Sequence, residues 1–413
     1  MLTKVIIFGA SGDLGKRKLI PAMENLIDKK LITDVEVIGI GRRKINVEEY
    51  LQDIFKDSWY EKNITKVFDF YDFDITNQVT IDNLYKKIDI NNPNQNVIMF
   101  LSLPPNNMED YINTLGMNKF NKPNVKILIE KPFGDNYESA KRLFNVINSY
   151  FKDQNVFLLD HYLCKKFMQN FNNFKLLDAN FYKKFNSEYI ESININALEA
   201  IDIQGRVNFY EQTGALKDFV VNHMMEMLCT VISLPKNLKN EEIIKSRIAA
   251  CKQLFLINDD TITAQYLGYK DEVNNQASIT ETFIKIHLRS NDKKWTNVDF
   301  FLTSGKALSE KSNTIVIKYK NGEILNFELF PQNVFPNSFD NQPLNFIFNN
   351  SLLDCYEGVF FNAINDNKIV FATIEEILHN WQVYDELLVG WKNGKKHNLS
   401  YNKNAKYQTI VKN

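Results

Sequence analysis

Glycine and proline are both scarce in this chain. The sequence has 15 glycines and 10 prolines among 413 residues, where average usage would give roughly 50 of the two together. This shortage excludes collagen-like, Gly/Pro-rich and linker-dominated chains, and it makes the place of each glycine informative. Three of them, Gly9, Gly12 and Gly15, fall within one short stretch near the start of the chain.

Cysteine is scarce as well, and it shows no motif spacing. The four cysteines are Cys164, Cys229, Cys251 and Cys355, and no CxxC pair occurs. This scatter suggests neither a zinc knuckle nor a disulfide framework, so we expect reduced cysteines in a cytoplasmic protein. No apolar run approaches the roughly 20 residues of a membrane span, and the run over residues 5–8 is too short for a signal-peptide core. We therefore expect no membrane partner.

An excess of charge of one sign is also missing. The chain has 49 Lys and Arg against 50 Asp and Glu, a formal net charge of −1, so no basic surface for nucleic acid is indicated. The absence of GxSxG, Walker A and HExxH motifs argues against hydrolase, nucleotidase and metalloprotease functions. No metal site is expected, because no histidine stands at metal-ligand spacing from another. The five histidines are His161, His223, His287, His379 and His397.

What the sequence does contain is a strong hydrophobic pattern over a length that suits two domains. The first 160 residues alternate short apolar strands with amphipathic helices such as Val47–Phe55 and Tyr137–Tyr150. This alternation predicts an α/β domain with a parallel sheet covered on both faces. The expected strands are Val5–Phe8, Val35–Ile40, Val67–Tyr71, Val97–Leu101, Val125–Ile129 and Val156–Leu159.

The rest of the chain, residues 161–413, has a different pattern. Several strand-like runs follow one another without intervening helices, which predicts an α+β domain with an antiparallel sheet. The expected strands are Thr280–Arg289, Val298–Thr303, Ile315–Tyr319 and Ile324–Leu329, and the expected helices cover 213–232, 241–256, 349–363 and 374–389.

The glycine cluster follows the first strand and opens a helical segment. A strand, a tight glycine turn and a helix N-terminus together favour a pyrophosphate group. The GxxGxxG spacing is a weak signal by itself, because a glycine turn with no ligand can look the same, and Pro21 should kink or delay the helix. Arg42 and Arg43 end the second strand where a carboxylate would suit NAD, so the turn favours the 2′-phosphate of NADP or is a solvated basic turn.

Three further segments carry chemistry. Glu130 and Lys131 end the strand Val125–Ile129, and the bond from Lys131 to Pro132 is a candidate for a cis peptide. If a helix starts at Asp160, then His161 and Lys165 share a face and could hold an anion, although a structural histidine is the simpler interpretation.

His223 lies on the apolar side of an expected helix, where a lone histidine is more often part of the core. Asp218 precedes it by five residues, about 140° around an ideal α-helix. The spacing therefore does not by itself place the two side chains together.

Seven runs, in order along the chain, make it resemble the glucose-6-phosphate dehydrogenase family. They are GASGDLGKRKLIP at 9–21, LSLPP at 101–105, EKPFG at 130–134, DHYLCKK at 160–166, QGRVNFYEQTGALKDFVVNH at 204–223, SITETF at 278–283 and TSGKALSEKS at 303–312. The resemblance implies a Rossmann-like NADP-binding domain (1–160) and a larger β+α domain (161–413) with a mainly antiparallel sheet. It implies oxidation of D-glucose 6-phosphate to 6-phospho-D-glucono-1,5-lactone with NADP, in some members also NAD, at the start of the oxidative pentose phosphate pathway. A homodimer or homotetramer is implied as well.

The resemblance also assigns roles to individual residues. It gives His223 the role of general base and Asp160 that of its orienting partner. The implied cofactor-binding residues are Gly9, Ser11, Gly12, Asp13, Leu14, Arg42 and Lys131. The implied substrate-binding residues are Lys131, His161, Tyr162, Lys165, Glu199, Asp218, Lys306 and Lys311.

The chain departs from the family pattern at several positions. Cys164 and Lys166 stand where the family usually has glycine and glutamate. A basic residue is missing at Thr303 and Ser312, so a second, structural NADP site is not expected, and the usual C-terminal tail is absent. These changes leave two alternatives open: a non-catalytic protein that binds NADP or a sugar phosphate, and a dehydrogenase of another sugar or sugar phosphate.

Overall fold

The chain divides into two compact units. The computed structural model describes residues 1–329, 332–336, 338–339, 342–344, 353–394, 396 and 398–412. Unit 1 comprises Met1–Gly134, Glu138–Lys165 and Ser351–Ile374, and unit 2 comprises Asp135–Tyr137, Lys166–Asn350 and Glu375–Asn413. His397 and the start of the expected helix 349–363 lie outside the described residues. In the part of the chain that is described, no helix is both long and apolar enough to cross a membrane.

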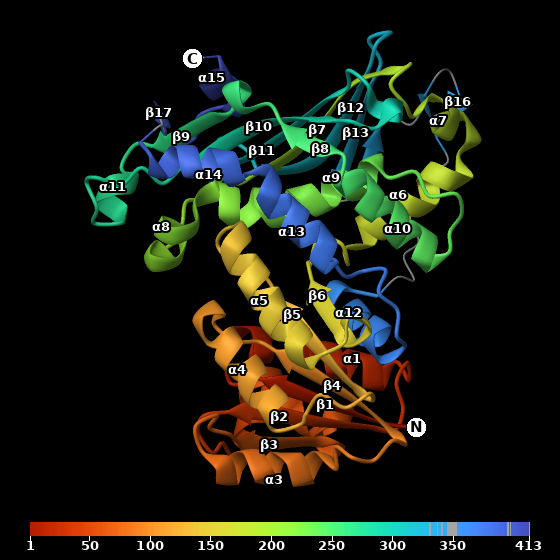
Figure 1. The fold of residues 1–413 in the computed structure, drawn as a ribbon, viewed down its shortest axis with the longest axis vertical. Helices are drawn as coiled ribbons and strands as arrows, with labels where there is room; N and C mark the ends of the chain where they lie inside the picture. The colour runs from red at the N-terminus through yellow and green to blue at the C-terminus, as the bar shows by residue number, and fades with distance from the viewer. Residues whose placement is uncertain are drawn as a thin grey trace. The chain divides into compact units, whose positions relative to one another are not determined.

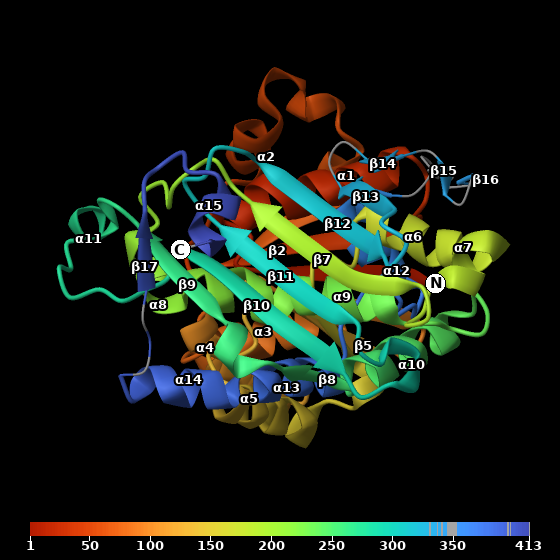
Figure 2. The same cartoon turned by 90° about the horizontal axis from the view of Figure 1, so that it is seen from above.

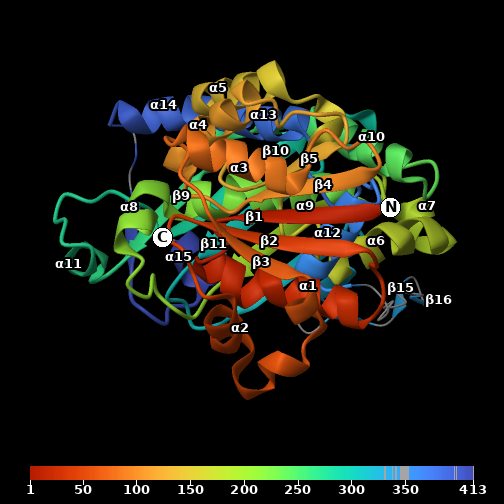
Figure 3. The same ribbon diagram turned by 90° about the horizontal axis from the view of Figure 1, so that it is seen from below.

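Unit 1 is built on a six-stranded parallel sheet in the order β3-β2-β1-β4-β5-β6. The strands are β1 (Leu2–Phe8), β2 (Val35–Gly41), β3 (Phe68–Asp72), β4 (Gln95–Leu101), β5 (Val125–Glu130) and β6 (Val156–Leu159). Nearly every residue of β1 and β4 is buried, as expected for parallel strands covered on both faces. Figure 3 shows β1, β2 and β3 side by side. The predicted α/β fold and all six strands are confirmed.

The helices of unit 1 connect these strands, and a late segment joins them. They are α1 (Ile20–Asp28), α2 (Val47–Phe55), α3 (Gln78–Ile88), α4 (Pro105–Met117), α5 (Tyr137–Tyr150) and α12 (Cys355–Ile364). A short π-helix (Gly15–Leu19) precedes α1 without a break, and Pro21 lies in the first turn of α1. In α12, Phe360 packs on Phe100 of β4 with a centroid distance of 5.6 Å.

Unit 2 is built on a nine-stranded sheet, which Figure 2 shows from one face. Its order is β14-β13-β12-β7-β11-β10-β9-β17, with β8 also paired to β10. The strands are β7 (Ile190–Leu198), β8 (Leu254–Leu256), β9 (Ile262–Tyr266), β10 (Phe283–Ser290), β11 (Asp299–Gly305), β12 (Ser312–Tyr319), β13 (Ile324–Leu329), β14 (Gln332–Phe335) and β17 (Asn398–Tyr401). The pairs β7–β11 and β9–β17 are parallel and the others antiparallel, which confirms a mainly antiparallel sheet.

Helices α6, α9, α10 and α13 lie on one face of this sheet (Figure 1). The helices of unit 2 are α6 (Lys166–Leu177), α7 (Ala179–Lys184), α8 (Val207–Ala215), α9 (Met225–Ile232), α10 (Asn240–Cys251), α11 (Tyr269–Glu272), α13 (Ile374–Val383), α14 (Asp385–Lys392) and α15 (Tyr407–Val411). The expected helix 241–256 is wrong at its end, because Leu254–Leu256 pairs with β10 as a strand. A short apolar run fits either structure until its neighbours are known.

Candidate active site

The glycine turn after β1 is shaped by close backbone contacts. Gly9 has φ +75°, and a Cβ atom there would lie 2.1 Å from the carbonyl oxygen of Ser102. A Cβ atom on Gly15 would lie 2.2 Å from the carbonyl oxygen of Ala10. These two glycines therefore let the turn lie against the end of β4 and against itself. Ser11, Gly12 and Asp13 are exposed.

The predicted cofactor and substrate residues of unit 1 gather at one edge of its sheet. Parallel strands all end at the same edge, which is where ligands bind in such folds. The glycine turn follows β1, Arg42 follows β2, Lys131 follows β5, and Asp160 follows β6. Arg42 and Arg43 are exposed, as a phosphate-binding pair would need to be. The sheet therefore brings together residues that are more than a hundred positions apart in the sequence.

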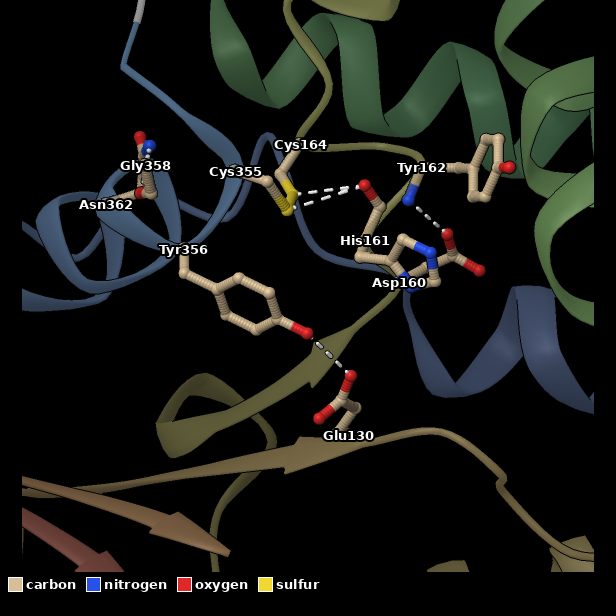
Figure 4. The surroundings of a disulfide bond; sticks show 9 residues. All are labelled: Glu130, Asp160, His161, Tyr162, Cys164, Cys355, Tyr356, Gly358 and Asn362. Carbon is tan, nitrogen blue, oxygen red and sulfur yellow. Dashed lines mark hydrogen bonds between the residues drawn. A yellow bond between two sulfur atoms is a disulfide. The ribbon is translucent and has the colours of Figure 1, made fainter. Parts of the chain in front are cut away.

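Glu130, at the end of β5, is held inside this edge. The Tyr356 hydroxyl of α12 donates a 3.0 Å hydrogen bond to Glu130 Oε1 (Figure 4). Burial raises the pKa of the Glu130 carboxyl, and the hydrogen bond from Tyr356 partly offsets this. The bond between Lys131 and Pro132 is cis, as suggested from the sequence.

The segment that follows β6 is a turn rather than a helix. Asp160 Oδ1 accepts a 2.8 Å hydrogen bond from the Tyr162 N–H, and the Leu163 N–H donates to the Asp160 carbonyl at 3.1 Å. Helix α6 begins only at Lys166. The condition under which His161 and Lys165 would share a helical face, a helix start at Asp160, is therefore not met. Lys165 instead places its Nζ 3.3 Å from the centroid of the Tyr162 ring.

A disulfide bond fixes this turn to α12, which corrects the expectation of four reduced cysteines. Cys164 and Cys355 are bonded across a sequence separation of 191 residues, with their Cα atoms 5.0 Å apart. Their sulfur atoms lie 3.2 and 3.4 Å from the His161 carbonyl oxygen (Figure 4). Sequence spacing could not show this pair, because only the folding of unit 1 brings α12 next to the turn after β6. Cys229 and Cys251 are buried free thiols.

In unit 2, two predicted substrate residues form an ion pair. Glu199 follows β7 and Lys306 follows β11, and these strands are parallel neighbours that end at the same edge. Lys306 Nζ pairs with Glu199 Oε2, and the two side chains are 4% and 38% exposed. A partly exposed carboxylate held by a buried ammonium group is well suited to contact sugar hydroxyls. Lys311 is exposed in the connection from β11 to β12.

Asp218 and His223 lie on a π-helix, Leu216–Met224, between α8 and α9. In a π-helix the N–H of residue i+5 bonds to the carbonyl of residue i, so residues five apart are one turn apart. The α-helical geometry assumed for the sequence would separate Asp218 and His223 by about 140° around the axis, whereas π-helical geometry makes this angle much smaller. His223 is fully buried, with its ring 5.1 Å from that of Phe219.

The comparisons with known proteins decide the family. Residues 6–170 match the model of the glucose-6-phosphate dehydrogenase NAD binding domain, and residues 173–342 match that of the glucose-6-phosphate dehydrogenase C-terminal domain. The chain is 31% identical over 349 residues to glucose-6-phosphate 1-dehydrogenase of Buchnera aphidicola subsp. Baizongia pistaciae, covering 76% of this chain and 70% of the relative. The chain belongs to the glucose-6-phosphate dehydrogenase family. It is thus an oxidoreductase with a nicotinamide-nucleotide-binding domain.

Two further family members match nearly the whole chain. Glucose-6-phosphate 1-dehydrogenase of Buchnera aphidicola subsp. Schizaphis graminum is 28% identical, covering 94% of this chain and 91% of the relative. A solved structure of a glucose-6-phosphate dehydrogenase in complex with glucose 6-phosphate has a TM-score of 0.89 at 20% identity, covering 99% of this chain and 97% of its own. That structure supports the fold of this family member across both domains.

Sequence reasoning missed three residues that support these segments. Tyr356 and Cys355 come from α12, and no spacing signal links α12 to the residues it contacts. Glu281 lies inside the run SITETF, which marked the family but suggested no role for this carboxylate. The Glu281 carboxylate accepts a hydrogen bond from the Leu216 N–H at the start of the π-helix.

Proposed function

We propose that this protein oxidises D-glucose 6-phosphate at C1 to 6-phospho-D-glucono-1,5-lactone and transfers the hydride to NADP. The observation that carries the proposal is the family match over both domains, since one holds the nucleotide turn and the other the π-helix with His223. The reaction is the entry step of the oxidative pentose phosphate pathway.

In this proposal His223 is the general base that takes the proton of the C1 hydroxyl. Imidazole suits this step because its pKa lies near neutral pH, and an acid–base group of this kind contributes typically about 10²- to 10⁴-fold in rate. Asp160 has the role of orienting the base and stabilising its charged form. A bound nicotinamide would supply the acceptor for the hydride.

The remaining residues would position the sugar. In this proposal the phosphate is bound by His161, Tyr162 and Lys165. The sugar hydroxyls are bound by the Glu199–Lys306 pair and by Asp218. Lys131 and Lys311 make further contacts with the substrate. Because the phosphate is remote from C1, its binding energy can be used to align the reacting carbon.

NADP is the proposed cofactor, with NAD as a second, slower one. Arg42 and Arg43 are exposed at the end of β2, and no ion pair involving either is found among the described residues. Two such guanidinium groups fit a 2′-phosphate. The exposed stretch Ser11–Asp13 fits a pyrophosphate at the start of the helical segment. We also propose a homodimer or homotetramer. A cytoplasmic location stays part of the proposal, although the disulfide bond removes the support that four reduced cysteines would have given it.

The test is a direct assay. Purified protein mixed with glucose 6-phosphate and NADP should generate the absorbance of reduced nicotinamide, and a parallel series with NAD should be slower. Sugars without phosphate, and other sugar phosphates, serve as controls for specificity. Tight binding of NADP and glucose 6-phosphate without turnover would overturn the catalytic proposal, and faster turnover of another sugar would overturn the substrate.

A further inference from the structure

Glu281 binds the backbone at the start of the π-helix. Its Oε1 accepts a 2.8 Å hydrogen bond from the Leu216 N–H, and its backbone carbonyl accepts a 3.1 Å bond from the Ala215 N–H. Glu281 is 2% exposed. The Leu216 N–H also donates to the Thr213 carbonyl, so the carboxylate is a second acceptor for this donor. A negative charge at this end of a helix is also favoured by the helix dipole.

Gly214 makes room for this carboxylate. The residue has φ +59°, and a Cβ atom there would lie 2.4 Å from Glu281 Oε1. Any side chain would therefore push Glu281 away from the helix start, in addition to straining the backbone. The glycine and the glutamate belong to two separate family runs, and the structure gives both one purpose.

The other oxygen of Glu281 is bound by the C-terminal segment. Lys396 Nζ pairs with Glu281 Oε2, and the two side chains are 7% and 3% exposed. The same ammonium group lies 4.1 Å from the centroid of the Trp391 ring. Lys396 precedes β17, which pairs with β9, and Tyr401 at the end of β17 donates a 2.8 Å hydrogen bond to the Lys306 carbonyl. The segment is thus fixed at both ends.

We propose that Lys396 is a positioning residue for the reaction: through Glu281 it holds the N-terminal end of the π-helix that carries Asp218 and His223. The proposal rests on the proposed function, because it takes His223 to be the base. It gives the segment over residues 396–401 a role in catalysis without contact with the reacting atoms. Misplacing a base by about 1 Å can lower the rate about 100-fold. An interaction that fixes the start of the π-helix should therefore affect kcat.

The experiment compares Lys396→Met with Lys396→Arg. We expect kcat to fall about 10- to 100-fold in Lys396→Met and to recover to within about threefold of wild type in Lys396→Arg, which keeps the ion pair. The KM for NADP should stay unchanged in both variants. Titration with NADP should give one binding site per chain, which shows that a low kcat does not come from a fraction of misfolded protein. Lys403→Met is the matched control from the same segment, since Lys403 forms an exposed pair with Asp202.

A double variant tests whether kcat falls only because a buried charge is left without its partner. Lys396→Met leaves a buried carboxylate uncompensated, whereas Glu281→Gln with Lys396→Met removes both charges. If positioning is the role, the double variant folds and its kcat stays low; recovery to the wild-type kcat would overturn the proposal. Equal kcat in Lys396→Met and wild type would also overturn it.

Hydrogen–deuterium exchange separates this proposal from the proposed function. Amides of residues 215–224 should exchange faster in Lys396→Met than in wild type, whether or not glucose 6-phosphate is a substrate. Unchanged exchange there would overturn the role of Lys396 in holding the π-helix. Wild-type protein without turnover would overturn only the proposed function.

Discussion

The proposed site residues are kept in position by different interactions in the two units. In unit 1 the turn over residues 160–165 is kept in shape by backbone hydrogen bonds and by the disulfide between Cys164 and Cys355. In unit 2 the π-helix and the residue after β11, Lys306, are held by ion pairs. The pairs are Lys396–Glu281 and Lys306–Glu199, and both lysines are buried.

This difference has a physical consequence. A cross-link acts mainly by restricting the unfolded chain, so its removal leaves native contacts in place. Removal of one partner from a buried ion pair instead leaves an uncompensated charge in the folded protein, at a cost of about 3–5 kcal/mol. Activity should therefore be more sensitive to the loss of one of these ion pairs than to the loss of the disulfide.

The largest effect is expected at His223 in unit 2. Asparagine keeps a polar side chain of similar size but cannot take a proton, so His223→Asn should lower kcat by about 10²- to 10⁴-fold. Binding of NADP, measured by titration, should stay near normal. The control is His379→Asn, on α13, which should change kcat by no more than about twofold. Substantial turnover by His223→Asn would remove this residue from the base role.

The Lys306–Glu199 pair is the next test of unit 2. Lys306→Met removes a charge-assisted hydrogen bond worth about 1.5–3 kcal/mol, so kcat/KM for glucose 6-phosphate should fall about 10- to 100-fold. Lys318→Met is the matched control, because Lys318 pairs with Glu191 on the same sheet with side chains 43% and 47% exposed. Its kcat/KM should change by no more than about twofold. Equal effects of the two variants would contradict the substrate role of Lys306.

The sequence was sufficient for much of unit 1 because its strands are continuous apolar runs. The bounds of β6, α2 and α5 agree with those expected, and the glycine turn falls at the end of β1. The pattern that marks a buried parallel strand is local, so no knowledge of distant residues was needed.

The π-helix and the turn at Asp160 could not be predicted in the same way. An α-helix and a π-helix share nearly the same apolar pattern, and only the observed hydrogen bonds place Asp218 one turn from His223. At Asp160 no proline or glycine marks the turn; the side chain itself binds the Tyr162 N–H and replaces a helix start. The disulfide and the Lys396–Glu281 pair join residues far apart in sequence. The roles of His223, Asp160 and the substrate residues stay predictions.

A smaller effect is expected at the cofactor edge of unit 1. Arg42→Ala removes a proposed contact with the 2′-phosphate, so the KM for NADP should rise about tenfold while the KM for NAD stays the same. Arg142→Ala on α5 is the control, since Arg142 is exposed and pairs with Glu109. Equal changes in the KM for NADP and NAD would show that Arg42 does not read the 2′-phosphate.

The smallest effect on activity is expected from the disulfide. Cys355→Ser removes the cross-link but keeps the hydrogen bond from Tyr162 to Asp160, so the KM for glucose 6-phosphate should rise by no more than about threefold. The free energy of unfolding of unit 1, measured in urea, should fall by about 2–4 kcal/mol. Dithiothreitol should bring the wild-type protein to the values of Cys355→Ser and should leave the variant unchanged. If the wild-type protein does not respond, or if it yields four reactive thiols when denatured without reductant, the cross-link is not formed and the contrast between the two units fails at this turn.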